Sequence, residues 1–259
     1  MIYEVSVAGE VALERLETEG TFTVHSVFSN GMNLIADNRL IFVGTNKNGY
    51  FPFGLTLSKG SMNEVLQLVK IGDTIKKYNN EIRHRLFSLM LNNTKILKNN
   101  KEFKNTDIIT LYNNIKTINF SGYNNSDFDE KSMRNLLFAL KSNNNLLEKN
   151  LRFFIGRGQG LTPTGDDIIT GILYADAIQP FIHKESFAKI EELYKLNLTT
   201  IVSQQFVLLA LEKIFSSKIT DLHEYPTLKS LESLVLLGST SGLDTLYGIY
   251  QTLKQEWYE

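Results

Sequence analysis

Residues 156–167, GRGQGLTPTGDD, bring together the residue types in this sequence that are best suited to chemistry. Four glycines and two threonines precede a pair of neighbouring carboxylates, Asp166 and Asp167, and an apolar run follows. Clustered glycines before a helix let backbone N–H groups approach an anion, and the helix dipole favours negative charge at that end. The segment therefore predicts a helix whose N-terminus binds a phosphate or a carboxylate.

The same pattern occurs a second time, near the C-terminus. Residues 239–249, STSGLDTLYGI, match residues 162–172, TPTGDDIITGI, at the hydroxyl, glycine and second aspartate positions and at the final isoleucine. Matching positions lie 77 residues apart, as Gly165 and Gly242 do. We expect the two helix N-termini to approach each other, which would form one pocket with donors on both sides.

Part of this pattern has a purely structural explanation. The four-residue patterns T-x-x-D at residues 164–167 and S-x-x-D at residues 241–244 have the spacing of a capping box. The glycine four residues after each aspartate shares its helical face and suits close contact between helices. Capping requires neither the upstream glycines nor the additional carboxylate of Asp166, so we expect a ligand-binding role as well.

The candidate site residues form two groups. The candidate catalytic carboxylates, which would orient the loop or hold a divalent metal such as Mg²⁺ next to the anion, are Asp166, Asp167 and Asp244. The candidate substrate-binding residues are Arg157, Gly158, Gly160, Thr162, Thr164, Gly165, Ser241 and Gly242. Oriented N–H donors of this kind can also stabilise the charge that develops in a tetrahedral intermediate.

The segments FIGRGQGLTPTGDDIITGIL and LLGSTSGLDTLYGIY resemble the bacterial domain-of-unknown-function 2877 family. VHSVFSNGMNL and FPFGLTL also resemble its opening strands, and the resemblance is weakest across residues 92–126. The family includes the AllH-type subunit of the oxamate carbamoyltransferase complex of allantoin and purine breakdown. The resemblance implies a role in carbamoyl transfer between oxamate and phosphate, with oxamate or carbamoyl phosphate as the small anionic ligand. It also implies separate partner subunits in a hetero-oligomeric complex.

The sequence departs from the family pattern at two places. Thr164 stands where serine is usual, and Ser239-Thr240 replaces a common His-Ser pair, so a catalytic histidine there would be missing. Two other functions remain open: a metal-dependent hydrolase in which paired aspartates activate water, and a non-catalytic assembly subunit. A histidine-based metal site is not expected, because none of the four histidines is paired at ligand spacing: His25, His84, His183 and His223.

Composition limits the classes of protein that fit. The 259 residues are 42% hydrophobic and carry a formal net charge of −1, so neither nucleic acid nor a membrane surface is an expected partner. The absence of cysteine excludes disulfides and thiolate catalysis. No signal peptide and no apolar run of about 18 residues is evident, which favours a cytoplasmic protein.

The order of the expected elements indicates an α+β fold, with a β-rich N-terminal lobe followed by an all-helical C-terminal lobe. Strands are expected at residues 21–28, 33–37, 39–45, 53–58 and 65–71, with a hairpin at 75–84 that turns at Asn79-Asn80. Helices are expected at residues 129–144, 166–178, 186–196, 199–215, 228–238 and 243–257. The expected domains are a β-rich lobe at 1–95, a linker or variable insertion at 96–126 and a helical lobe at 127–259.

Overall fold

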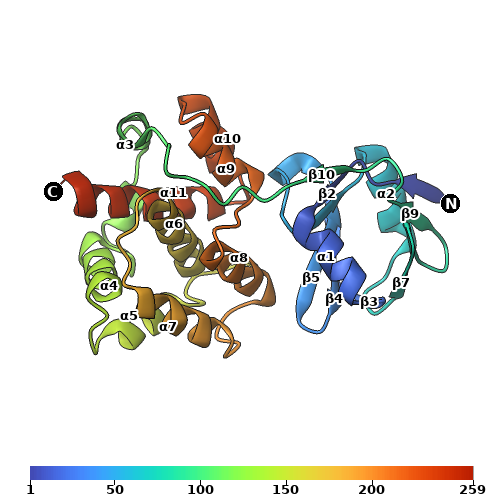
Figure 1. The fold of residues 1–259 in the computed structure, drawn as a ribbon, viewed down its shortest axis with the longest axis horizontal. Coiled ribbons are helices and arrows are strands. Elements are labelled where there is room, and N and C mark those ends of the chain that lie inside the picture. The colour runs from blue at the N-terminus through green and yellow to red at the C-terminus, as the bar shows by residue number, and fades with distance from the viewer. Residues whose placement is uncertain (259) are drawn as a thin grey trace. The chain divides into compact units, whose positions relative to one another are not determined.

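The computed structural model describes the backbone of residues 1–258 and the side chains of residues 1–256. The chain forms two compact units, Met1–Asn99 and Asn100–Glu259. Strands dominate the first unit and helices make up the second (Figure 1). The α+β architecture predicted from the sequence, with a β-rich part followed by an all-helical part, is therefore confirmed.

Ten strands of the first unit form a single sheet, in the order β1-β9-β8-β7-β3-β4-β5-β6-β2-β10. The strands are β1 (Ile2–Glu4), β2 (Val7–Gly9), β3 (Thr21–Phe28), β4 (Gly31–Ala36), β5 (Arg39–Gly44), β6 (Gly54–Thr56), β7 (Thr74–Tyr78), β8 (Glu81–Arg83), β9 (Ser88–Met90) and β10 (Lys95–Leu97). β1 and β2 belong to opposite ends of this order, yet only residues 5–6 separate them along the chain. The sheet is therefore curled.

Alternating side chains build the core of the first unit. Along β3, Phe22 and Val24 are buried while their neighbours Thr21 and Thr23 are exposed, as period-2 patterning predicts. The expected hairpin is confirmed, because β7 and β8 pair antiparallel around Asn79, whose φ is 48°. Asparagine tolerates this left-handed conformation better than most residues do.

Two helices, α1 (Glu10–Thr18) and α2 (Lys59–Leu68), accompany the sheet. The strand expected at residues 65–71 is wrong, because Val65 to Leu68 form the last turn of α2. Ser58 caps this helix by accepting a hydrogen bond from the Ser61 amide at 3.1 Å. The apolar run has helical spacing once this cap is taken into account, since Met62 and Val65 are the residues it buries.

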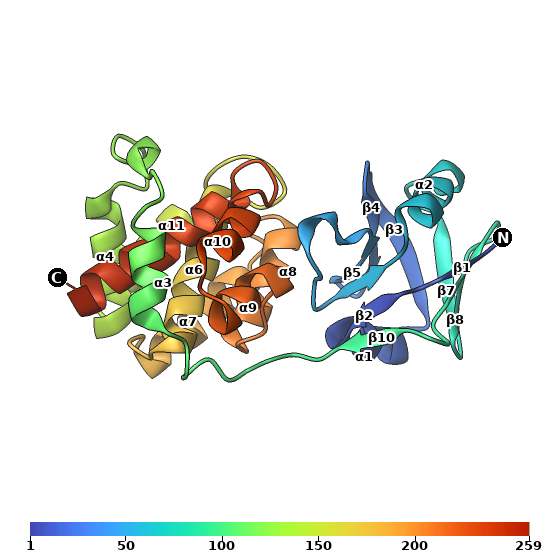
Figure 2. The ribbon, with the colours of Figure 1, turned by 90° about the horizontal axis from the view of Figure 1, so that it is seen from above.

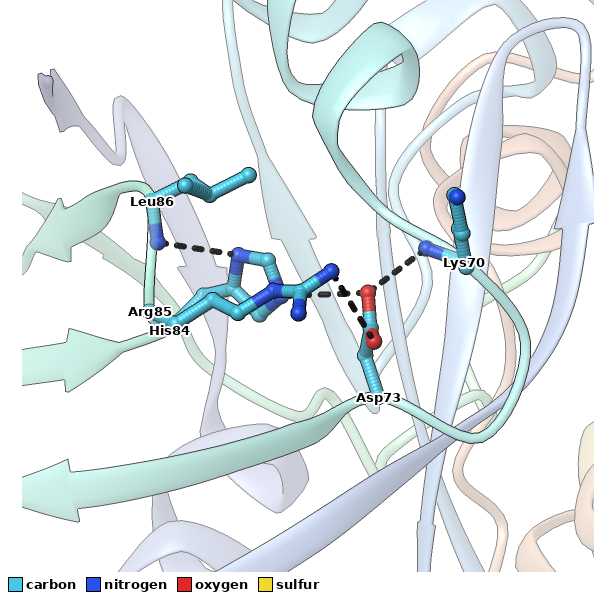
Figure 3. A network of polar contacts seen from close by, with 5 residues as sticks. All are labelled: Lys70, Asp73, His84, Arg85 and Leu86. Atoms are coloured by element: carbon cyan, nitrogen blue, oxygen red, sulfur yellow. Dashed lines mark hydrogen bonds and ion pairs between the residues drawn. The ribbon is translucent and has the colours of Figure 1, made fainter.

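The buried His84 side chain links two turns of the first unit through hydrogen bonds (Figure 3). His84 Nε2 lies 3.1 Å from Asp73 Oδ2, and the Leu86 amide donates to His84 Nδ1 at 3.4 Å. The Lys70 amide also donates to Asp73 at 2.8 Å, and this bond, with that from His84, lowers the pKa of Asp73. The polar groups of His84 are thus used locally, which is a structural role.

The second unit consists of nine α-helices among the described residues. They are α3 (Ile108–Ile115), α4 (Glu130–Ser142), α5 (Leu147–Phe154), α6 (Thr164–Ile178), α7 (Lys184–Tyr194), α8 (Ile201–Leu211), α9 (Ser217–Glu224), α10 (Leu228–Val235) and α11 (Ser241–Leu253). The region read as a linker or insertion contributes α3, which buries Leu111 and Ile115 in the helical core. No helix of the described chain is both long and apolar enough to cross a membrane.

Helix α6 is the central element of the second unit. Apart from Thr164 and Asp167, its residues are buried, which is typical of a helix surrounded by others. α11 lies beside it in both views (Figures 1 and 2). These two helices carry the two repeated segments of the sequence.

Candidate functional site

Two glycines allow α6 and α11 to touch. A Cβ at Gly171 would overlap the carbonyl oxygen of Thr245, and a Cβ at Gly248 would overlap the carbonyl oxygen of Ile168. Thr245 is the counterpart of Ile168 at the 77-residue offset, so the contact is reciprocal. The predicted approach of the two repeated segments is therefore observed, with a local two-fold relation between them.

The loops that lead into α6 and α11 repeat the same hydrogen bonds. The Gly165 amide donates to the Arg157 carbonyl at 2.9 Å. Equivalently, the Gly242 amide donates to the Leu237 carbonyl at 3.2 Å. A Cβ at either glycine would overlap a carbonyl at the end of the preceding helix, α5 or α10. Gly165 and Gly242 therefore serve close packing, and their N–H groups are already occupied.

Each loop also has a glycine with positive φ that folds over the start of its helix. Gly158 has φ 119°, and a Cβ there would lie 2.6 Å from the Thr164 nitrogen. Gly238 has φ 64°, and a Cβ there would lie 3.3 Å from Ser241 Oγ. Gly238 is thus the partner of Gly158, which the sequence comparison missed because the two loops differ in length.

The first loop is three residues longer than the second. Eight residue steps separate Arg157 from Gly165, whereas five separate Leu237 from Gly242. With Gly158 and Gly238 matched, the extra segment is residues 159–161, in which Gly160 has φ 91° and no neighbouring atom within 4 Å of its Cβ position. The backbone at Gly160 is therefore open, unlike that at the other loop glycines.

The capping-box interpretation is wrong. Thr164 and Ser241 are the first helical residues rather than caps, and neither helix has a side-chain cap hydrogen bond. Instead, the hydroxyl of each lies beside the aspartate of the opposite helix: Ser241 beside Asp167, and Thr164 beside Asp244. Ser241 also shares a 2.6 Å hydrogen bond with Thr162 from the other loop. Five polar side chains thus meet between the two helix N-termini.

Asp166 points away from this meeting point and is used structurally. Its carboxylate accepts hydrogen bonds from the Gly156 amide at 3.1 Å and the Tyr194 hydroxyl at 2.7 Å. The Thr199 hydroxyl donates to its other oxygen. Burial raises the pKa of Asp166, and these three donors oppose the rise by stabilising the ionised form. Asp166 therefore ties the glycine loop to α7 and to the start of α8.

The carboxylates of Asp167 and Asp244 differ from that of Asp166, because each leaves one buried oxygen without a hydrogen bond from any described residue. Burial raises the pKa of Asp167 well above its usual value, and the Asp244 charge adds to the rise, while the Ser241 and Thr162 hydroxyls oppose it. Burial also raises the pKa of Asp244, against the Tyr123 hydroxyl, which donates to Asp244 Oδ1 at 2.5 Å. In both side chains the Oδ2 atom is buried and has no hydrogen-bond partner among the described residues.

Arg157 is engaged elsewhere in this structure. Its Nη1 atom lies 2.7 Å from Asp127 Oδ2, and its guanidinium group stacks 4.0 Å from the centroid of the Phe153 ring. Nε donates to the Phe153 carbonyl. The side chain remains 40% exposed, so its charge lies at the surface of the loop.

The chain as far as the structure describes it contains no group of three His, Asp or Glu side chains that could hold a metal ion. The three candidate catalytic aspartates do not form such a group, since Asp166 faces Tyr194 and Thr199. The arrangement that the structure offers is instead a pair of carboxylates surrounded by hydroxyls.

Sequence reasoning missed the residues that support this pair from distant parts of the chain. Tyr123 lies in the segment read as linker, and its ring stacks on Tyr247 with centroids 3.8 Å apart. Tyr194 and Thr199 hold Asp166 from beyond α6. The positions of Tyr123, Tyr194 and Thr199 along the sequence do not indicate that these residues contact the motif. Ser203 also lies beside Asp166. Its buried hydroxyl has no hydrogen-bond partner among the described residues.

The fold and the site define a class of protein with a curled-sheet unit and a helical unit, the latter built around a repeated glycine loop and helix. A family model described as the AllH family N-terminal domain matches residues 4–96, and one described as oxamate carbamoyltransferase subunit AllH matches residues 154–253. The chain belongs to the AllH family, as its repeated motif indicated. No solved structure matches it.

Proposed function

We propose that this protein acts as the AllH subunit of a cytoplasmic oxamate carbamoyltransferase complex, in allantoin and purine breakdown. The observation that carries the proposal is the family match, which includes most of the strand-rich unit and the whole α6–α11 crossing. In this role the chain works together with separate partner subunits. The small ligand is oxamate or carbamoyl phosphate.

The ligand-binding surface lies where the loops before α6 and α11 meet. Residues 158–161 and 238–240 are exposed, and the hydroxyls of Thr162, Thr164 and Ser241 lie half-buried below them. An anion here meets hydroxyl donors and the open backbone at Gly160. The amides of Gly165 and Gly242 are not available to it, so these two residues contribute shape rather than hydrogen bonds.

Reconstitution with partner subunits from the same genome tests the assignment. We expect the complex to transfer a carbamoyl group between oxamate and phosphate, and the activity to disappear when this chain is left out. Carbamoyl phosphate, phosphate or oxamate should also raise the melting temperature of the complex, because a ligand that binds only the folded state stabilises it. Each titration is run with and without Mg²⁺, and a larger shift with Mg²⁺ indicates a bridging metal.

A matched pair of variants locates the ligand. Gly160→Val should reduce the ligand-induced shift, because a side chain would cover the open backbone. Gly72→Val is the control, since Gly72 also has positive φ (89°) and open space, but belongs to the first unit. If both variants lose the ligand-induced rise in melting temperature equally, or if neither loses it, Gly160 is not part of the ligand-binding site.

A further inference from the structure

Two buried carboxylate oxygens at the α6–α11 crossing lack a hydrogen-bond donor. They are Oδ2 of Asp167 and Oδ2 of Asp244, and the Asp244 residue is only 2% exposed. Buried polar atoms are normally paired, because leaving a carboxylate oxygen desolvated without a donor is costly. Two such atoms at equivalent positions of a repeated motif point to a donor that arrives with a ligand.

The geometry brings these two side chains to the same place. Each aspartate lies four residues before the glycine at which its helix touches the other helix, and hence on the same face. Each also has the first hydroxyl of the opposite helix beside it. Asp167 is half-buried, whereas Asp244 is buried, so Asp167 is the member of the pair nearer to solvent.

The groups around the pair do not neutralise it. Tyr123 donates to the other oxygen of Asp244, and Asp166 and Tyr194 are occupied with each other. No lysine or arginine among the described side chains forms an ion pair with any of the three aspartates. Two adjacent buried carboxylates without a cation favour sharing one proton. The pair then offers one O–H donor and one carboxylate acceptor.

We propose that Asp167 and Asp244 together bind the primary amide group, H₂N–C=O, of oxamate or of the transferred carbamoyl group. The amide nitrogen donates to the carboxylate, and the amide oxygen accepts from the protonated partner. A primary amide is the complement of such a pair, since it presents one donor and one acceptor side by side. This assignment rests on the proposed function and identifies which end of the ligand the aspartates contact.

Calorimetric titration of the assembled complex tests the proposal with amide-blocked ligands. We expect oxamate to bind at least tenfold more tightly than N,N-dimethyloxamate, which cannot donate. Asp167→Ala and Asp244→Ala should each reduce this ratio toward one, because each removes one of the two groups that hold the amide, whereas asparagine would again supply a donor and an acceptor. Asp176→Ala is the matched control, because Asp176 is also buried in α6 but accepts from the amides of Phe181 and Ile182. It should keep the ratio, and melting temperatures show that each variant is folded.

The outcomes separate the two proposals. Equal affinity for oxamate and its dimethyl derivative, or an unchanged ratio in both the Asp167→Ala and Asp244→Ala variants, overturns amide binding by the pair while leaving carbamoyl transfer intact. A complex that discriminates these ligands but transfers no carbamoyl group overturns the proposed activity alone. In a parallel arm with carbamoyl phosphate and phosphate, loss of discrimination in the variants assigns the bound amide to the carbamoyl group. If none of these ligands binds the wild-type complex, both proposals fail.

Discussion

Asp166 and Asp167 are neighbours in sequence whose surroundings give them different roles. Asp166 accepts three hydrogen bonds that close the glycine loop, whereas Asp167 lies beside Ser241 of α11 and within reach of the Asp244 charge. A helix turns by about 100° per residue, so adjacent side chains of α6 point to different parts of the molecule. The pair of carboxylates in the motif is thus one structural residue, Asp166, followed by one, Asp167, whose Oδ2 atom has no hydrogen-bond partner among the described residues.

Removing the Asp166 carboxylate should destabilise the second unit. In Asp166→Ala the buried Tyr194 hydroxyl and the Gly156 amide lose their acceptor, so we expect a loss of about 2–4 kcal/mol, the cost of unsatisfied buried donors. Urea denaturation followed by circular dichroism measures it. Asp127→Ala removes an exposed carboxylate paired with Arg157 and should cost less than about 1 kcal/mol. Equal losses in the two variants would contradict the structural role of Asp166.

The buried aspartates also predict how stability depends on pH. The folded-state pKa values of Asp166, Asp167 and Asp244 are raised, while an unfolded aspartate titrates near about 3.9. The folded protein therefore binds more protons above that pH, and its stability should fall as pH rises through the raised values. Asp167→Asn, which cannot ionise, should show a smaller decrease between pH 5 and pH 8 in urea denaturation. Parallel curves for the variant and the wild type would argue against an ionisable buried pair.

At the scale of elements, the close crossing of α6 and α11 depends on the glycines at its centre. Gly171→Ala and Gly248→Ala would each place a methyl group against a carbonyl of the other helix. We expect destabilisation of about 1–3 kcal/mol from overpacking, despite the gain of about 1 kcal/mol in helix propensity. Gly60→Ala in α2, where the Cβ position is open, should be neutral or stabilising. Thermal unfolding compares the three, and stabilisation of all of them would mean that the helices can separate at no cost.

The helices that could be predicted from the sequence are those whose apolar residues recur clearly at helical spacing. α4, α6, α7, α8, α10 and α11 each overlap an expected helix. α1 and α2 were not expected, because they are short and lie among strands, so their apolar residues resembled strand patterning. α3, α5, α9 and α10 are eight residues each, a length at which periodicity is a weak guide, and of these four only α10 was expected.

The candidate site could be located from the repeat but not resolved into roles. The 77-residue offset brought Asp167 and Asp244 together, since both helices use the same face for contact. The difference between Asp166 and Asp167 depends on Tyr194 and Thr199, and these reach α6 only through tertiary packing. Gly238 was missed because a loop of different length interrupts the match.

At the scale of the whole molecule, the two units are joined by a short segment that is anchored at both ends: the Asn99 amide donates to Glu10 Oε2 of the first unit at 3.1 Å. β10 ends at Leu97, and Phe103 is buried in the second unit against the rings of Tyr174 and Phe215. Thr106 Oγ1 then lies 2.6 Å from His223 Nδ1. Residues 98–102 therefore connect the units without regular secondary structure.

Limited proteolysis should cut the chain between the units. Lys98 and Lys101 are exposed and lie outside helices and strands, so we expect trypsin to cleave there first and release two fragments that resist further digestion. Lys104 follows the anchored Phe103 and should be cleaved more slowly. The double variant Lys98→Gln with Lys101→Gln should lose the early cleavage. Mass spectrometry identifies the sites, and early cuts within α6 or the sheet would contradict a division at this place.

The extra residues 159–161 have a consequence for how a molecule with two unlike ends is held. Two loops related by perfect two-fold symmetry would bind such a molecule in either of two reversed orientations with the same energy. Because this segment occurs before α6 and has no counterpart before α11, the two orientations differ in energy. A ligand bound between the loops, as proposed above, would then prefer one orientation and present the same end to the longer loop at every binding event.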